Sequence, residues 1–314
     1  MPAILISVIL GIGLNLRFST GAMPATVGQT SVHMLFLICS LTLLFLVGIA
    51  DDLIGVRYRA KFLFQIIGGV LVVISGMWVS DLYGFLGIEQ FPDWLGWALT
   101  VLLVVYVTNA INLIDGVDGL ASGLAIMICG CYAALFAIDY HWFYATVSLC
   151  TVGVLIPFFS YNVFGTVERG TKIFMGDTGS LTIGFLISFL TIAYCGDQDS
   201  VSANPMLTCF ALLMVPCLDV LRVMLHRARK GLPIFLPDRN HIHHKLIDAG
   251  CSTKQTLAVV IGLSLGYAAL NFGLQRVLNI HLLILLDVLS WTVFNVWLTW
   301  LIKCRKANNK VCLS

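Results

Sequence analysis

Long runs of apolar residues, separated by short clusters of polar residues, glycine and proline, dominate the pattern of this sequence. A helix that crosses a bilayer needs roughly 20 mainly apolar residues, and ten runs of about that length occur. We therefore predict an all-α, polytopic integral membrane protein with about ten transmembrane helices. The predicted spans cover residues 2–16, 32–50, 61–80, 95–114, 119–138, 142–164, 179–195, 204–220, 255–272 and 278–302.

Composition agrees with this prediction. Of the 314 residues, 59% are apolar and only 11% are charged, and the mean hydropathy is +0.95. These values lie far outside the range of soluble domains, and the ten cysteines form no C-x-x-C pair that would indicate a zinc ribbon. No internal repeat or soluble domain is visible, so residues 1–314 are predicted to form a single transmembrane domain. The first run starts at Met1 without a charged segment or cleavage site, which indicates a clipped first helix rather than a signal peptide.

The distribution of charge predicts the orientation of the spans. If the first run starts in the cytoplasm, 16 of the 18 Lys and Arg residues fall in cytoplasmic segments, which fits the positive-inside rule. Acidic residues carry little weight in that rule, yet the same alternation of loops places six aspartates on the cytoplasmic side. Charged residues at helix ends on one face indicate a shared aqueous site. The six are Asp51, Asp52, Asp115, Asp118, Asp177 and Asp238.

Two adjacent aspartates, Asp51 and Asp52, end a predicted span in the string GIADDLIGV. Neighbouring carboxylates repel, so both stay ionised only if a cation compensates them. A divalent metal, alone or bound to a phosphate, would do so, and so would the nearby Arg57. A hydrated helix end that repels the membrane surface is the alternative interpretation.

Amides and acids recur at every third residue in the string NAINLIDGVDGLASG, as Asn109, Asn112, Asp115 and Asp118. Residues three apart are neighbours on a helix, so we expect consecutive members to face one cavity. The glycines between them let the backbone approach a ligand closely. Hydrogen bonds that only join helices are the alternative, but two acids and two amides beside the membrane favour a functional site.

A third string, KIFMGDTGSLTIG, places Asp177 at the start of a span. A helix N-terminus attracts anions through its free N–H groups, and an N-cap is the commonest role of Asp at such a position. Metal binding is the functional alternative. Phe174, three residues earlier, is a candidate for stacking on a base, with packing at the membrane interface as the other interpretation.

The fourth string, HRARKGLPIFLPDRNHIHHKL, contains three histidines, His241, His243 and His244, behind Asp238 and Arg239. Three close histidines suggest zinc, but no Cys or Glu stands at the spacing of a zinc finger or zincin. Contact with a pyrophosphate fits better, because a guanidinium offers a planar fork to phosphate oxygens beside the imidazoles.

These four strings, in this order and on one side of the membrane, resemble the polyprenyl-phosphate N-acetylhexosamine-1-phosphate transferase family. They are adjacent aspartates, N-x-x-N-x-x-D-G-x-D-G-L-A, M-G-D-x-G-S and P-D-x-x-H-I-H-H, and together they span residues 48–246. The histidine string looks like that of the WecA-like branch, which acts on UDP-GlcNAc or a related UDP-HexNAc.

The resemblance implies a role for each residue at a cytoplasmic active site. Asp177 would be a ligand of Mg²⁺, with Mn²⁺ as an alternative. The implied catalytic carboxylates are Asp51 and Asp52 beside the metal and the lipid phosphate, and Asp115 and Asp118, which shape the nucleotide pocket. The implied substrate-binding residues are Asn112 in the same pocket, Phe174 against uracil, and Arg239, His241, His243 and His244 at the pyrophosphate and sugar.

The resemblance also implies the reaction. A HexNAc-1-phosphate, GlcNAc-1-phosphate as the first expectation, would pass from a UDP-sugar to undecaprenyl phosphate in the bacterial cytoplasmic membrane, with release of UMP. This step starts the synthesis of a lipid-linked glycan. The expected partners are the UDP-sugar, polyprenyl phosphate and membrane lipids, with no nucleic acid. Whether the protein forms a homodimer is left open by the sequence.

One departure from the family leaves alternatives open. A further span and a P-R-x-G-G string usually precede the helix that corresponds to residues 2–16, so we expect either a start codon placed too late or a truncated chain. An inactive paralogue that scaffolds envelope enzymes is therefore one alternative, and a transporter or flippase is another. Acids at one face, rather than at the midplane between repeated halves, favour the enzyme over a transporter.

Overall fold

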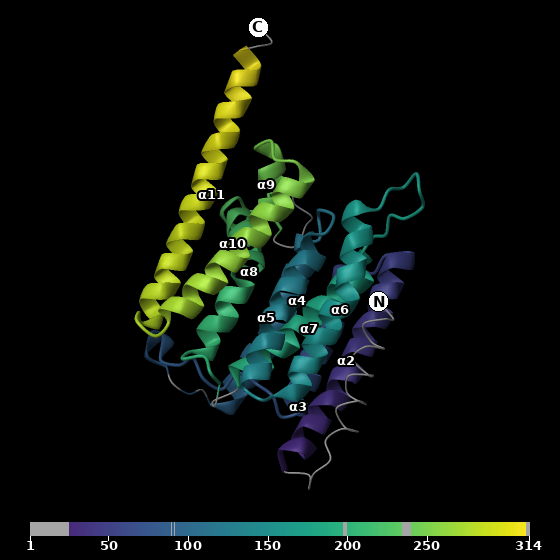
Figure 1. Ribbon diagram of the computed structural model, residues 1–314, viewed down its shortest axis with the longest axis vertical. Helices are drawn as coiled ribbons and strands as arrows, with labels where there is room; N and C mark the ends of the chain where they lie inside the picture. Colours follow the sequence, from purple (N-terminus) through teal and green to yellow (C-terminus); the bar gives the residue numbers. More distant parts are fainter. Residues whose placement is uncertain (1–24, 89, 91, 197–199, 234–239, 312–314) are drawn as a thin grey trace.

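The computed structural model describes residues 25–311, except residues 89, 91, 197–199 and 234–239. This part of the chain folds into ten α-helices and a 3₁₀ turn, η1 (Phe85–Gly87) (Figure 1). The helices are α2 (Ala25–Ile54), α3 (Tyr58–Ile74), α4 (Asp93–Ile114), α5 (Leu120–Ile138), α6 (Trp142–Phe164), α7 (Gly176–Cys195), α8 (Pro205–Arg229), α9 (Ile242–Asp248), α10 (Thr253–Leu274) and α11 (Ile280–Val311).

Eight of the described helices, all except α3 and α9, are long and apolar enough to cross a membrane. The chain is thus a multi-pass membrane protein, in agreement with the predicted all-helical fold. The predicted span 61–80 corresponds to α3, whose 17 residues rise about 26 Å, slightly less than the hydrocarbon core of about 30 Å. The chain leaves the helix after Ile74 and turns at Gly76, which has a φ of 97°. The predicted span 2–16 lies outside the described residues.

Helix α7 is the centre of the bundle. It is the most buried of the candidate spans, at 94% of its most apolar stretch, and α2 and α4 pack along it. Small residues permit this close packing: a Cβ atom on Gly184 of α7 would lie 2.9 Å from the backbone of Thr108 in α4. A span whose apolar side chains are not confined to one stripe is expected at the centre of a bundle, where the helix is buried on every side.

A second close approach joins α2 to α7 at Gly48. A Cβ atom here would lie 2.9 Å from the backbone nitrogen of Thr178, closer than real Cβ contacts. We expect Gly48→Ala to push the two helices apart and to lower the free energy of unfolding by about 1–3 kcal/mol. Thermal unfolding in detergent measures this. The control is Gly153→Ala, whose added methyl meets no atom of the described residues within 4 Å. Equal melting temperatures for the two variants would contradict the prediction.

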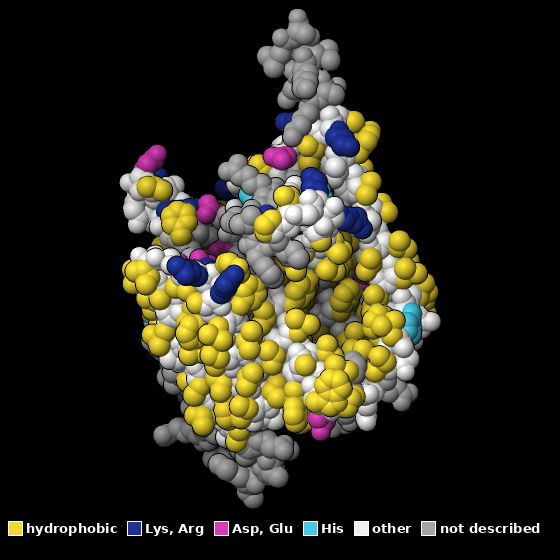
Figure 2. Space-filling model, turned by 180° about the vertical axis from the view of Figure 1, so that it is seen from behind, with side chains coloured by type: hydrophobic (Ala, Val, Ile, Leu, Met, Phe, Trp, Pro, Cys, Tyr) yellow, Lys and Arg dark blue, Asp and Glu magenta, His cyan; other side chains and the backbone are white. Residues whose placement is uncertain are grey.

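The polar loops that carry the sequence motifs gather at one end of the bundle. Figure 1 shows the end of α2, the α4–α5 turn, the α6–α7 loop and α9 at its upper end. Figure 2 shows Lys and Arg side chains near the same end, above a belt of apolar side chains. Loops far apart in the sequence therefore meet at one face of the membrane domain.

Candidate active site

The first turn of α7 is capped by a side chain from another helix. Asp52, near the end of α2, accepts hydrogen bonds from the backbone N–H groups of Asp177 (2.8 Å) and Thr178 (3.1 Å) and from the Thr178 hydroxyl. The N-cap residue of α7 is Met175, and Asp177 lies inside the first turn. The interpretation of Asp177 as an N-cap is therefore wrong. Asp52 satisfies the N–H groups instead, which leaves the Asp177 carboxylate available for other contacts.

The carboxylates of Asp51 and Asp177 meet beside a lysine from α3. Lys61 forms an ion pair with Asp51, and its Nζ lies 3.3 Å from Oδ2 of Asp177. On the other side, the amide of Asn112 donates to Oδ1 of Asp177 at 2.6 Å and lies 2.7 Å from the Ser180 hydroxyl. The Asp177 carboxylate is thus held in place by residues of α3 and α4.

The end of α4 supplies two further carboxylates. Because α4 ends at Ile114, Asp115 and Asp118 lie in the turn before α5 and not on a continuous helix, yet both line the same cavity as Asn112. Asn109 does not line it. Its amide donates to Oε1 of Gln65 in α3 at 2.5 Å, so Asn109 joins two helices.

The α6–α7 loop closes the third side of the site. Lys172 donates to Oδ2 of Asp118 at 2.7 Å and also to the carbonyl of Asn162. Asn162, in the last turn of α6, accepts a hydrogen bond of 2.5 Å from the backbone N–H of Gly119 and donates to the carbonyl of Ile173 in the loop at 2.7 Å, which ties the loop to the start of α5. Phe174 is 70% exposed at the rim, so its ring is accessible to a ligand.

These loops enclose a cavity of about 420 Å³ that opens at the upper end of the bundle. Carboxylates, amides and exposed backbone dominate its lining, as suits a polar ligand with an aromatic part. The lining residues are Asn112, Asp115, Gly116, Val117, Asp118, Asn162, Phe174, Met175, Gly176, Asp177 and Ser180.

The cavity changes the acidity of one of its carboxyl groups. Burial, with Asp177 and Asp118 nearby, raises the pKa of Asp115 to about 6, compared with about 3.9 in an unfolded chain. The folded state therefore holds this proton more tightly. The contribution of protonated Asp115 to stability is present below about pH 4 and is lost as the pH rises towards 6.

Asp115→Asn should therefore stabilise the fold at pH 8 but not at pH 4. We expect its melting temperature in metal-free detergent solution to exceed that of the wild type by on the order of 5 °C at pH 8, because the ionised carboxylate is absent. Scanning fluorimetry at both pH values measures this difference. Asp93→Asn, at the exposed other end of α4, is the control. A gain for Asp115→Asn that is equal at both pH values would contradict the prediction.

The histidine segment lies directly behind the wall of the cavity. His243 is 1% exposed, and its ring packs so tightly on Gly116 that a Cβ atom there would lie 2.9 Å from Cε1. Burial and the neighbouring imidazoles lower the pKa of His243 to about 4, so it is neutral at pH 7. The His244 ring lies 4.2 Å from the His243 ring. Arg239 and Asp238 lie outside the described residues.

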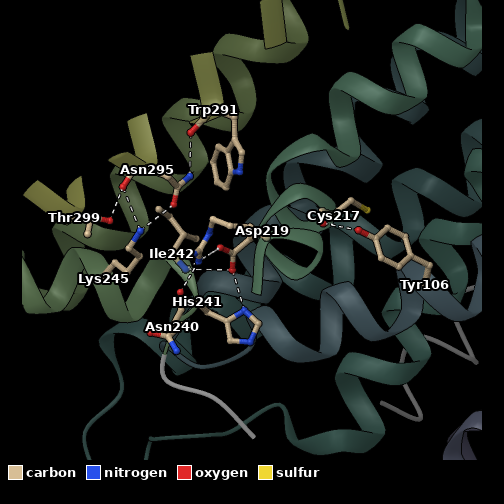
Figure 3. A network of polar contacts seen from close by, with 11 residues as sticks. Tyr106, Cys217, Asp219, Asn240, His241, Ile242, Lys245, Trp291, Asn295 and Thr299 are labelled. Carbon is tan, nitrogen blue, oxygen red and sulfur yellow. Dashed lines mark hydrogen bonds and ion pairs between the residues drawn. The ribbon is translucent and has the colours of Figure 1, made fainter. Parts of the chain in front are cut away.

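His241 is held by a buried aspartate that the sequence motifs do not include. Asp219 of α8, 1% exposed, lies 2.9 Å from Nδ1 of His241 and accepts from the backbone N–H of Ile242 at 3.0 Å (Figure 3). Arg222 donates to the same carboxylate at 2.8 Å. The His241 and His243 rings are parallel, with centroids 5.8 Å apart. Asp219 thus anchors the segment whose histidines stand behind Gly116.

The donors at the site suit a magnesium ion that also binds a substrate phosphate. No cluster of three His, Cys, Asp or Glu side chains of the kind that holds a metal alone occurs among the described residues. Mg²⁺ usually retains several waters and takes one or two carboxylates plus phosphate oxygens. Asp177 and Asp51, within ion-pair distance of one lysine, supply such a pair, so the residues present fit this ion.

The structure brings together most of the residues predicted from sequence and adds three. Seven of the predicted residues lie at or beside the cavity: Asp51, Asp52, Asp115, Asp118, Asp177, Asn112 and Phe174. Behind it, the rings of His241 and His243 are stacked and the ring of His244 lies next to that of His243. Lys61, Lys172 and Asp219 are not among the residues that the motifs predict for the site. In the sequence, the two lysines indicate only the topology. Asp219 did carry a signal, since an acid within an apolar run requires a partner.

Comparison with known proteins identifies related chains. The protein is 33% identical over 219 residues to a probable undecaprenyl-phosphate N-acetylglucosaminyl 1-phosphate transferase of Bacillus subtilis (strain 168), a match that covers 69% of this chain and 59% of that protein. It is 32% identical over 247 residues to the undecaprenyl-phosphate alpha-N-acetylglucosaminyl 1-phosphate transferase of Escherichia coli (strain K12), which covers 75% and 65%. The chain thus spans about three fifths of the length of these relatives.

The family profile of glycosyl transferase family 4 matches residues 34–195. This segment is more than half of the chain and contains every aspartate that lines or flanks the cavity. The protein therefore belongs to glycosyl transferase family 4.

Proposed function

We propose that this protein transfers HexNAc-1-phosphate, with GlcNAc-1-phosphate as the first candidate, from a UDP-sugar to undecaprenyl phosphate and releases UMP. The observation that carries the proposal is the convergence of carboxylates from α2, the α4–α5 turn and α7 on one polar cavity at a membrane face. Membership of family 4 and the names of the relatives support it. The basic residues at the same end support a cytoplasmic location for the cavity, in a bacterial cytoplasmic membrane.

The proposed reaction is a phosphoryl transfer. An oxygen of the lipid phosphate attacks the sugar-bearing phosphorus, a new P–O bond forms, and the bond from this phosphorus to the bridging oxygen of UMP breaks. The second pKa of a phosphate monoester is near 6, so the nucleophile is already largely deprotonated at neutral pH. Positioning of the reactants and stabilisation of charge therefore matter more than a general base.

Different residues of the cavity would bind different parts of the substrates. Phe174 at the rim offers a ring on which the uracil stacks, while Asp115 and Asn112 shape the pocket for the nucleotide. The histidine segment, anchored by Asp219, would contact the pyrophosphate and sugar. Asp177, with Asp51 beside it, would hold Mg²⁺, which neutralises charge on the pyrophosphate and on the departing UMP when it is bound.

A reconstituted assay tests the proposal. Purified protein in detergent would receive UDP-GlcNAc, undecaprenyl phosphate and Mg²⁺, and both UMP and the lipid-linked sugar would be measured. We expect equal amounts of the two products, and loss of both when the lipid is omitted or EDTA is added. No UMP release with UDP-GlcNAc, UDP-GalNAc or another UDP-HexNAc would overturn the proposal, and comparison of these donors identifies the sugar.

The same assay separates two routes. In direct attack, labelled UMP enters the UDP-sugar pool only when the lipid is present. In a covalent route, one of the cavity aspartates first takes the sugar phosphate, so labelled UMP exchanges into UDP-sugar without lipid. We expect no lipid-independent exchange, because the acceptor phosphate is itself a competent nucleophile.

A further inference from the structure

A second cavity, of about 650 Å³, lies between α8 and α11. It is a groove with two different ends. Apolar side chains from both helices line most of its length, among them Leu218, Leu221 and Val288. Basic side chains line the end nearest the C-termini of the two helices: Arg222, His226, Arg229, Lys245 and Lys303.

The basic side chains fall into an inner and an outer group. Arg222 is committed to Asp219, and Lys245 donates to the backbone carbonyl of Asn295 at 3.2 Å (Figure 3). Arg229 and Lys303 are exposed, and the described part of the chain supplies no acidic partner to either. The outer group thus presents two positive charges at the mouth of an apolar groove.

Two buried donors in the same groove also lack an acceptor within the described part of the chain. Arg222 Nε and the indole N–H of Trp291 are buried and have no hydrogen-bond partner among the described residues, and Trp291 is 4% exposed. Burial of an unpaired donor destabilises a protein, so such groups are normally satisfied by a ligand or water. Donors that require acceptors, in a groove with an apolar body and a cationic end, match a molecule that has acyl chains, ester carbonyls and an anionic phosphate.

We propose that this groove binds one anionic phospholipid of the surrounding bilayer. The phosphate lies against Arg229 and Lys303, the ester region faces the Arg222 and Trp291 donors, and an acyl chain follows the leucines of α8. Basic pockets between membrane helices recognise anionic headgroups in this way. The acceptor lipid of the proposed reaction fits less well, because the groove shares no lining residue with the aspartate cavity and Asp219 with its histidines lies between them.

Native mass spectrometry of the protein released from neutral detergent tests the proposal. Phosphatidylglycerol and phosphatidylcholine are added separately, and the fraction of protein that retains one lipid is measured. We expect phosphatidylglycerol to be retained at least about 10-fold better than phosphatidylcholine. The double variant Arg229→Gln/Lys303→Gln should lose this preference. The matched control Lys230→Gln/Arg169→Gln removes the same charge from exposed positions outside the groove and should keep it.

A second variant tests the apolar part without a change of charge. Leu225→Trp adds bulk to the groove wall and should also lower phosphatidylglycerol retention. Equal retention in the two charge-removal pairs would overturn the proposal. So would displacement of phosphatidylglycerol by an equimolar amount of undecaprenyl phosphate, which would assign the groove to the acceptor, or a lipid-free dimer that the groove variants dissociate. The measurement needs no turnover, so its failure is distinct from failure of the proposed function.

Discussion

Asp177→Asn should abolish turnover while leaving the fold intact. The amide retains an oxygen that can accept from Asn112, and the cap from Asp52 contacts the backbone of residue 177, not its side chain. What disappears is the negative charge beside Asp51 that would hold Mg²⁺. Loss of one group that stabilises transition-state charge lowers rates by on the order of 100- to 1000-fold. Because Asp177 would also hold the ion, we expect kcat for UMP release to fall by about 1000-fold.

The control for this variant is Asp93→Asn, which removes the same charge at the exposed opposite end of α4. It should keep wild-type activity. Scanning fluorimetry should give similar melting temperatures for both variants, which separates a lost ligand from a lost fold. If Asp177→Asn turns over at the wild-type rate, Asp177 is not an essential ligand.

Asp219→Asn should reduce activity although the residue lies outside the aspartate cavity. The carboxylate accepts from Nδ1–H of His241, which leaves Nε2 as the nitrogen without a proton in the neutral ring. An asparagine that presents its NH₂ group to Nδ1 favours the opposite tautomer, and it also leaves Arg222 without its charged partner. Comparable losses of a partner that orients a histidine cost from 10-fold to 10,000-fold, and we expect a fall of on the order of 100-fold in kcat/KM.

Asp248→Asn is the matched control, because this acid is exposed at the end of α9 in the same segment. It should be close to wild type. The comparison of stability with activity provides a readout that a purely structural role would not give: the Asp219→Asn variant should lose kcat/KM at a temperature where scanning fluorimetry shows it fully folded. Wild-type kcat/KM in the folded variant would remove Asp219 from the positioning of the site.

The meeting of the motifs at one end of the bundle was predictable, because alternation of spans decides on which side each helix end lies. Which atoms meet was not. Asp51 and Asp52 are adjacent in sequence, but on a helix they point about 100° apart. Asp51 therefore pairs with Lys61, whereas Asp52 caps α7 through the backbone of Asp177, which lies 125 residues further along the chain.

The length of α3 shows a different limit of the sequence pattern. The apolar run continues to residue 80, and hydropathy alone extended the predicted span that far. The helix ends at Ile74 because Ser75 and Gly76 close its last turn, and Gly76 then adopts a left-handed conformation. Hydrophobicity indicates which residues avoid water, whereas local backbone geometry decides where a helix stops.

The capping of α7 by Asp52 has a consequence for the biogenesis of the protein. A ribosome that adds about 5–20 residues per second needs on the order of ten seconds to deliver α7 after α2. During that interval the two acids of α2 have no α7 to bind and must remain hydrated at the membrane surface. The candidate active site is therefore incomplete in every nascent chain that ends before α7. If the proposed function holds, turnover, rather than membrane insertion as such, reports that the bundle is assembled.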